Sequence, residues 1–210
     1  CLLETNLEIT RIGYSTTNFA DDMIFNESDG AVTYNAFKFG QYDNTWTNNS
    51  YIRCYEGIRQ ASILINNIEI ADYKAQARFL RSYFYWLLLR KYGPVPLIPE
   101  ETISIDEDYM DMSYPRSSYD EVVNYISEEM ALAARSLPEK RDRQNVNRST
   151  KGAALAVRAK VLLYTASPIN NPRPGDSDKF SDFTDWQGRM LMSQTYDESK
   201  WARAAAAAKD

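Results

Sequence analysis

The most informative absence from this sequence is histidine, which occurs nowhere in its 210 residues. Histidine is the commonest general base in enzymes and the commonest zinc ligand, so Ser-His and Cys-His catalytic pairs and imidazole zinc sites are excluded. The two cysteines, Cys1 and Cys54, have no C-x-x-C spacing, which also excludes thioredoxin-type chemistry and cysteine zinc sites. We therefore expect a protein without a cofactor or a catalytic metal ion.

Turn-forming residues and long apolar runs are also scarce. Eight glycines and eight prolines make up about 8% of the chain, against ~12% in average proteins, which argues against a turn-rich β-sandwich or barrel. The longest apolar run, residues 83–89, is about a third of the ~18 residues that a membrane-spanning helix needs. No basic segment is followed by an apolar one in the manner of a signal peptide. These scarcities favour a helical protein without a predicted transmembrane segment.

Positive charge is in deficit as well. The chain has 24 Lys and Arg residues against 29 Asp and Glu residues, which gives a net charge of −5. Nucleic acid is therefore excluded as a main partner, because phosphate binding needs a concentrated basic surface. Aromatic residues, by contrast, are abundant, since they make up 13% of the chain and include 15 tyrosines.

Five stretches have apolar residues at spacings of three and four, which is the pattern of amphipathic helices. We predict helices at residues 52–70, 73–92, 118–137, 149–166 and 197–210. Asp72 is placed to cap the second of these helices. Ser118-x-x-Glu121 has the form of a capping box for the third. Thr195-x-x-Glu198 has the same form for the fifth. The predicted fold class is all-α.

The second predicted helix is apolar on all sides over residues 83–89, so we expect it to be the most buried element. Its inner stripe is predicted to consist of Ala77, Leu80, Phe84, Leu87 and Leu88. Arg78 and Arg81 lie one turn apart on the same helix. We interpret them as structural arginines that pair with carboxylates or cap loops.

The helices are arranged as successive hairpins, in a pattern that fits loosely with tetratricopeptide repeats. We predict a single domain over residues 1–210, in which a loop-rich segment, 1–47, precedes a helical-hairpin scaffold, 48–210. Residues 168–195 form a second long loop, and loops of this length usually serve a function. The last helix reaches Asp210 without a stop signal, so we expect this domain to be the N-terminal or middle part of a longer chain.

Three segments carry a resemblance to a known family. Residues 75–98 contain RSYFYWLLLRKYGPVPLI, residues 148–168 are RSTKGAALAVRAKVLLYTASP, and residues 196–209 are YDESKWARAAAAAK. Together with Trp46, the order and spacing of these segments closely resemble the SusD/RagB family over about residues 46–210.

The resemblance implies a tetratricopeptide-like α-superhelix that carries an irregular, loop-rich ligand face. Members of the family are non-catalytic surface lipoproteins of the Bacteroidetes outer membrane. They cap a SusC-like TonB-dependent transporter and hand it oligosaccharides or, in some members, peptides. Because their mature chains begin with a lipidated cysteine, Cys1 is a candidate lipidation site. The alternative is that Cys1 is an internal residue at the edge of a fragment.

A sugar-binding site needs flat aromatic rings together with amide and carboxylate side chains, placed on loops of a rigid scaffold. The segment YDNTWTNNSY, residues 42–51, has this composition. Trp46 is its central aromatic residue, although it could instead pack on the first helix. The predicted ligand-binding residues are Tyr42, Asn44, Trp46, Asn48 and Asn49, joined from the 168–195 loop by Trp186.

Two other functions compete with glycan binding. A helical glycoside hydrolase would need two carboxylates, which the acidic stretch at residues 100–111 could supply. Nothing apolar near that stretch would raise the pKa of one of its acids, and it lacks the ligand pattern of a calcium-binding EF-hand. A tetratricopeptide-type interaction module would instead hold a peptide in its concave helical groove.

Overall fold

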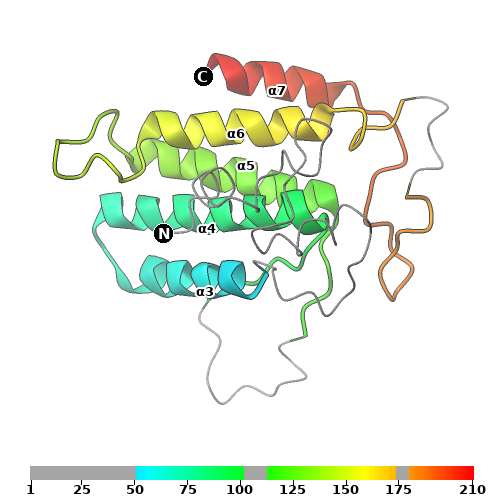
Figure 1. The fold of residues 1–210 in the computed structure, drawn as a ribbon, viewed down its shortest axis with the longest axis horizontal. Coiled ribbons are helices and arrows are strands. Elements are labelled where there is room, and N and C mark those ends of the chain that lie inside the picture. The colour runs from blue at the N-terminus through cyan, green and yellow to red at the C-terminus, as the bar shows by residue number, and fades with distance from the viewer. Residues whose placement is uncertain (1–50, 102–112, 174–179) are drawn as a thin grey trace, which may run out of the picture. The chain divides into compact units, whose positions relative to one another are not determined.

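Five helices follow one another in the part of the chain that the structure describes, which is residues 51–101, 113–173 and 180–210 of the unit Ser50–Asp210 (Figure 1). The structure is a computed structural model. The helices are α3 (Tyr51–Asn67), α4 (Ala71–Tyr92), α5 (Tyr119–Ser136), α6 (Lys151–Ala166) and α7 (Ser199–Lys209). Each coincides with a predicted helix to within three residues at either end, and the all-α prediction is confirmed. The only strand-like pairing within these residues is an isolated bridge between Thr184 and Met190.

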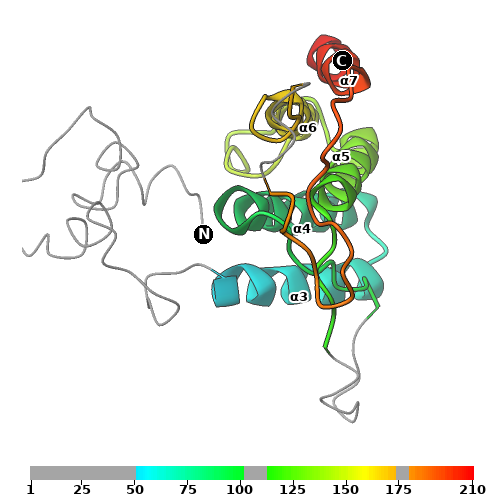
Figure 2. The same cartoon turned by 90° about the vertical axis from the view of Figure 1, so that its right-hand side faces the viewer.

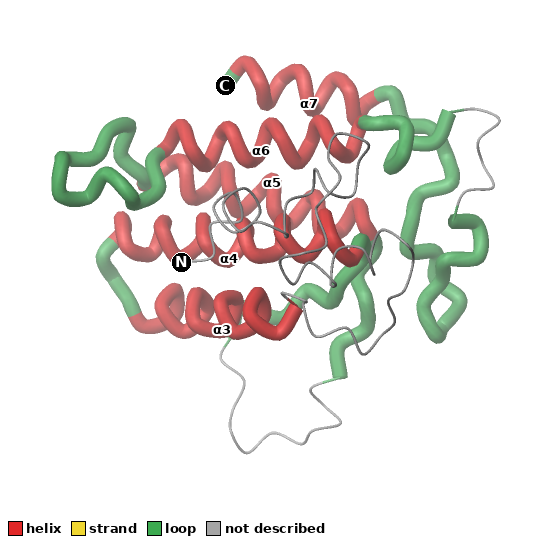
Figure 3. The backbone as a smooth tube through the Cα atoms, in the orientation of Figure 1, coloured by secondary structure: helices red, strands yellow, loops and turns green. Residues whose placement is uncertain are grey.

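Each helix packs on the next one along the chain, from α3 on α4 to α6 on α7. Figure 1 shows the resulting stack, and Figure 3 shows the loops gathered at its two ends. In Figure 2, α6 and α7 are seen almost end-on whereas α3 is seen from the side, so the helix direction turns along the stack. None of the described helices is long and apolar enough to cross a membrane.

Helix α4 forms the centre of the core, as its sequence predicts. Residues 85–89 are all at most 5% exposed, because α3 and α5 both pack on this helix. Tyr83 and Phe84 are half-buried. The predicted inner stripe is wrong at Leu80, which is 43% exposed. Gly57 of α3 lets the two helices approach closely, since a Cβ atom there would lie 2.5 Å from the ring of Phe84.

The start of α4 differs from the predicted cap. The helix begins at Ala71, so the N-cap position is occupied by Ile70, whose side chain makes no capping hydrogen bond. Asp72 instead accepts two hydrogen bonds of 2.7 Å from the guanidinium of Arg141 in the α5–α6 loop. The hydrogen bonds from Arg141 hold the pKa of Asp72 below its usual range. This pair fastens the loop at one end of the stack to the first turn of α4.

The Asp72–Arg141 pair predicts an acid-sensitive contribution to stability. Because the pKa of Asp72 is lower in the folded chain than in the unfolded one, the contribution is present above pH ~4 and is lost as the pH falls through the folded pKa. Asp72→Asn should lower the free energy of unfolding near neutral pH by at most about 1 kcal/mol, since the Asp72 side chain is 36% exposed. Urea unfolding from pH 7 to about pH 2 would show the two curves converging. The same change at exposed Asp182 is the control, and a difference that persists at low pH would contradict the assignment.

The remaining helix starts confirm one predicted capping box and correct the other. The Ser118 hydroxyl accepts from the Glu121 amide at 3.3 Å, and the Glu121 carboxylate accepts from the Ser118 amide at 2.6 Å. The box predicted at Thr195 does not form, because α7 begins at Ser199. There the Asp197 carboxylate accepts from the Ser199 amide at 2.9 Å.

The two arginines of α4 are structural, as predicted, but they use different partners. Arg78 pairs with Glu100 at 3.1 Å and with Glu129 at 2.6 Å. Arg81 is 1% exposed, and its partners among the described residues are neutral oxygens: the hydroxyls of Ser62 and Tyr125 and the carbonyl of Ile98. Arg81 thus ties three helices to the extended segment that follows α4.

That extended segment in turn positions the residues that precede α5. The Tyr55 hydroxyl donates to the carbonyl of Pro96 at 2.8 Å, and the Tyr85 hydroxyl accepts from the Ile98 amide at 2.9 Å. Further along, the Ser117 amide donates to the Val95 carbonyl at 3.2 Å. The core of the stack therefore holds the segment that leads into the pocket described next.

Candidate functional site: a pocket at one end of the stack

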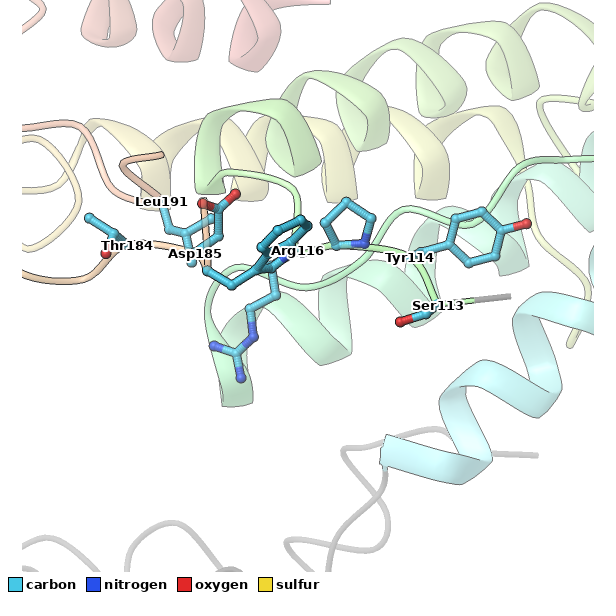
Figure 4. Close-up of a pocket in the computed structure, with 8 residues that line it drawn as sticks. Ser113, Tyr114, Arg116, Thr184, Asp185 and Leu191 are labelled. Atoms are coloured by element: carbon cyan, nitrogen blue, oxygen red, sulfur yellow. The ribbon is translucent and has the colours of Figure 1, made fainter. Parts of the chain in front are cut away.

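A pocket of about 570 Å³ lies where the segment before α5 meets a turn at residues 183–191 (Figure 4). Its lining combines aromatic, apolar, hydroxyl and charged side chains, namely Ser113, Tyr114, Pro115, Arg116, Thr184, Asp185, Trp186 and Leu191. Concave sites of this size, with apolar walls and a few polar groups, are typical of small-molecule binding.

The turn is held by its own backbone and by one carboxylate. The Leu191 amide donates to the Phe183 carbonyl at 3.1 Å, and Gly188 takes the left-handed conformation, with φ at +79°, that closes the turn. The Asp185 carboxylate accepts from the backbone amides of Gln187 at 3.0 Å and Arg189 at 2.8 Å. The backbone hydrogen bond from Arg189 is the main reason that the pKa of Asp185 lies below its usual range. Asp185 therefore acts as the internal brace of the turn.

Arg189 joins this turn to the opposite wall of the pocket. Its guanidinium bonds Asp185 at 3.1 Å, the backbone carbonyl of Arg116 at 2.5 Å and the carboxylate of Glu121 at 3.4 Å. The Tyr119 amide also donates to the Leu191 carbonyl at 2.9 Å. The two walls are thus fixed to each other and to the first turn of α5.

Trp186 is the one predicted ligand-binding residue that falls in the described part of the chain. It lies in the turn and lines the pocket, and 83% of its surface is exposed to solvent. The other predicted ligand-binding residues and the candidate lipidation site lie outside the described residues, namely Tyr42, Asn44, Trp46, Asn48, Asn49 and Cys1.

Sequence reasoning missed the wall formed by Tyr114 and Arg116. These residues follow the acidic stretch and precede the capping box, and no local pattern marks them as a site. The turn itself does carry a signal, because Asp185-Trp-Gln-Gly188 has Asp and Gly at the first and last positions of a type I turn. A tryptophan at a central position of such a turn is expected to have its ring exposed to solvent.

Three observations bear on the chemistry that this part of the chain can perform. Among the described residues that line the pocket, Asp185 is the only one with a carboxylate, and Arg189 forms an ion pair with it. Glu100, the first acid of the acidic stretch, is paired with Arg78. Within the residues that the structure describes, no group of three or more potential ligands is placed to hold a metal ion. The lining groups are therefore suited to binding by stacking and hydrogen bonding.

Comparison with known structures gives further information on the fold. A structure named BT4246 is 28% identical, with a TM-score of 0.70 over 84% of this chain and 31% of its own. A laminarin binding SusD-like protein is 24% identical, with a TM-score of 0.58 over 67% of this chain and 32% of its own. Surface glycan-binding protein A from Bacteroides uniformis is 21% identical, with a TM-score of 0.53 over 65% of this chain and 32% of its own. The chain thus spans about a third of the length of these proteins.

Sequence comparison gives the family. No curated protein matches the chain. A SusD-like family model, described as starch-binding associating with outer membrane, matches residues 7–163, which is well over half of the chain. This match confirms the resemblance found in the helical segments, and the chain belongs to the SusD-like family.

Proposed function

We propose that this chain is part of a non-catalytic glycan-binding protein and that the pocket beside Trp186 is an oligosaccharide site. The observation that carries the proposal is the exposed indole of Trp186, held by a braced turn at the edge of a pocket. An indole offers a large flat surface on which the apolar C–H face of a pyranose ring can stack. The hydroxyls of Ser113 and Thr184 line the same pocket and can hydrogen-bond sugar hydroxyls.

The setting of this function is proposed from the family. The family model describes proteins that associate with the outer membrane, and one structural neighbour is a surface glycan-binding protein. We place the chain at the cell surface, as part of an outer-membrane lipoprotein that works with a SusC-like TonB-dependent transporter. Cys1 remains the proposed lipidation site, and Tyr42, Asn44, Trp46, Asn48 and Asn49 remain proposed ligand-binding residues.

Trp186→Ala should weaken oligosaccharide binding by about thirtyfold, because loss of a stacking anchor from a small interface typically costs ~2 kcal/mol. The measurement is isothermal titration with a panel of laminarin, xyloglucan and starch oligosaccharides, alongside a melting curve. Trp201→Ala is the matched control, since this tryptophan of α7 is 42% exposed and does not line the pocket. Unchanged affinity in Trp186→Ala for every oligosaccharide that binds would place the site elsewhere.

The competing hydrolase hypothesis is tested with the same samples. A binding protein leaves the oligosaccharides intact, whereas a glycoside hydrolase releases new reducing ends. A reducing-sugar assay after prolonged incubation distinguishes the two, and release that survives purification to constant specific activity would overturn the non-catalytic proposal.

A further inference from the structure

We propose that the pocket beside Trp186 prefers an acidic oligosaccharide, one in which a uronate carboxylate binds Arg116. This inference rests on the proposed function and names the class of sugar that the pocket would take. It follows from which charged groups of the pocket are already engaged within the protein and which one is left to a ligand.

Arg116 is the cationic side chain among the described residues that line this pocket. Arg116 is exposed, and its guanidinium carbon lies 5.9 Å from the centroid of the Phe183 ring. In the described ranges, no carboxylate forms an ion pair with Arg116. Figure 4 shows its guanidinium projecting away from the ribbon, while the carboxylate of Asp185 points the opposite way. The cation is thus oriented by an aromatic ring and remains available.

The neighbouring charges are engaged with one another. The Asp185 carboxylate accepts from the backbone amides of Gln187 and Arg189 and also pairs with the Arg189 guanidinium. Its side chain is only 4% exposed. Glu121 accepts from the amide of Ser118 and from Arg189. Arg189 itself bonds both carboxylates and a carbonyl. Among the described residues that line the pocket, a ligand would therefore meet one charge without an ion-pair partner, the positive charge of Arg116.

The geometry of a guanidinium favours a carboxylate as its ligand. Its planar fork of donors matches the two oxygens of a carboxylate, and the resulting charge-assisted pair is stronger than a neutral hydrogen bond. Trp186 and Arg116 line the same pocket, so a sugar ring on the indole can direct its C6 carboxylate to the guanidinium. A neutral sugar would leave Arg116 with hydrogen bonds no better than those it makes to water.

The test compares sugars that differ only in this charge. Oligogalacturonate, oligomannuronate and hyaluronan oligosaccharides are each titrated into the 210-residue chain beside their methyl-esterified forms. At least one acidic form should bind about tenfold or more tightly than its ester, because a hydrogen bond to a charged group contributes ~1.5–3 kcal/mol. Arg116→Gln should remove that difference, because it should weaken binding of the acidic form by about tenfold or more and binding of the ester by much less. Arg143→Gln, an exposed arginine of the α5–α6 loop, is the control.

Salt concentration gives a second readout. Affinity for the acidic form should fall as sodium chloride is raised, and affinity for the ester should not. Equal binding of acid and ester, or no binding of any acidic form, overturns the inference. The proposed function is tested separately, by titration of the neutral oligosaccharides into the parent chain and Trp186→Ala. If neutral sugars bind through Trp186 but acidic ones are not preferred, the proposed function stands and only the preference for acidic sugars is overturned.

Discussion

Replacing Arg81 with alanine should lower the free energy of unfolding by about 4 kcal/mol or more. The change removes a large side chain that is 1% exposed and leaves a cavity in the core. It also leaves three acceptors without their donor, in buried Ser62 and in half-buried Tyr125 and Ile98. An unsatisfied group costs about 1–3 kcal/mol where it is fully buried. Urea unfolding followed by circular dichroism measures the loss.

Two further variants separate the parts of this effect. Arg81→Met restores most of the volume but none of the donors, so it should recover only the cavity contribution. Arg59→Ala removes an exposed arginine from α3 and should change stability by less than about 0.5 kcal/mol. If Arg81→Met were as stable as the parent chain, the three hydrogen bonds would contribute nothing net, as happens when apolar groups replace a costly buried charge.

Leu88→Ala should be the second large perturbation, with an expected loss of about 2–5 kcal/mol. Leu88 is 0% exposed near the C-terminal end of α4. Because α4 packs on both α3 and α5, we expect the cavity not to collapse fully. Leu80→Ala is a matched control on the same helix, because Leu80 is 43% exposed. Both variants replace leucine by alanine in the same helix, so the difference between their losses in free energy of unfolding reports on burial. Similar losses in both would contradict the packing described for α4.

The helices could be predicted closely because their signals are local. Two such signals are the apolar spacing and the Ser118 capping box, each of which acts within a few residues. A third is Gly93, which directly follows α4 as its C-cap. The predicted caps at Asp72 and Thr195 were wrong for opposite reasons. Asp72 accepts a hydrogen bond from Arg141, which lies 69 residues away, and no local pattern reveals that partner. Thr195 is replaced in this role by Asp197, which is closer to the start of α7 and accepts a hydrogen bond from the Ser199 amide.

The candidate site could be predicted only in part, because it is assembled from distant segments. Trp186 stands out in sequence as an aromatic residue of a long loop. Arg116 joins the same site through contacts between distant segments, among them the hydrogen bond to its backbone carbonyl from Arg189, which lies 73 residues further along. Periodicity and composition carry no information about such a pairing. The burial of Leu80 was overestimated for a related reason, since a helix that is apolar on all sides does not reveal which side a neighbour covers.

The order in which the helices pack also sets how local opening is distributed along the chain. Within the 210 residues, α7 packs chiefly on α6, whereas α4 is enclosed by helices on both sides, so in this chain we expect α7 to open while the centre stays folded. Protection against amide hydrogen exchange should therefore be graded, highest in α4 and lower toward α7, instead of uniform. The two walls of the pocket therefore belong to parts of the chain with different expected protection against exchange. The wall before α5 is fastened to the well-protected centre, and the Trp186 turn lies on the connection that leads to α7.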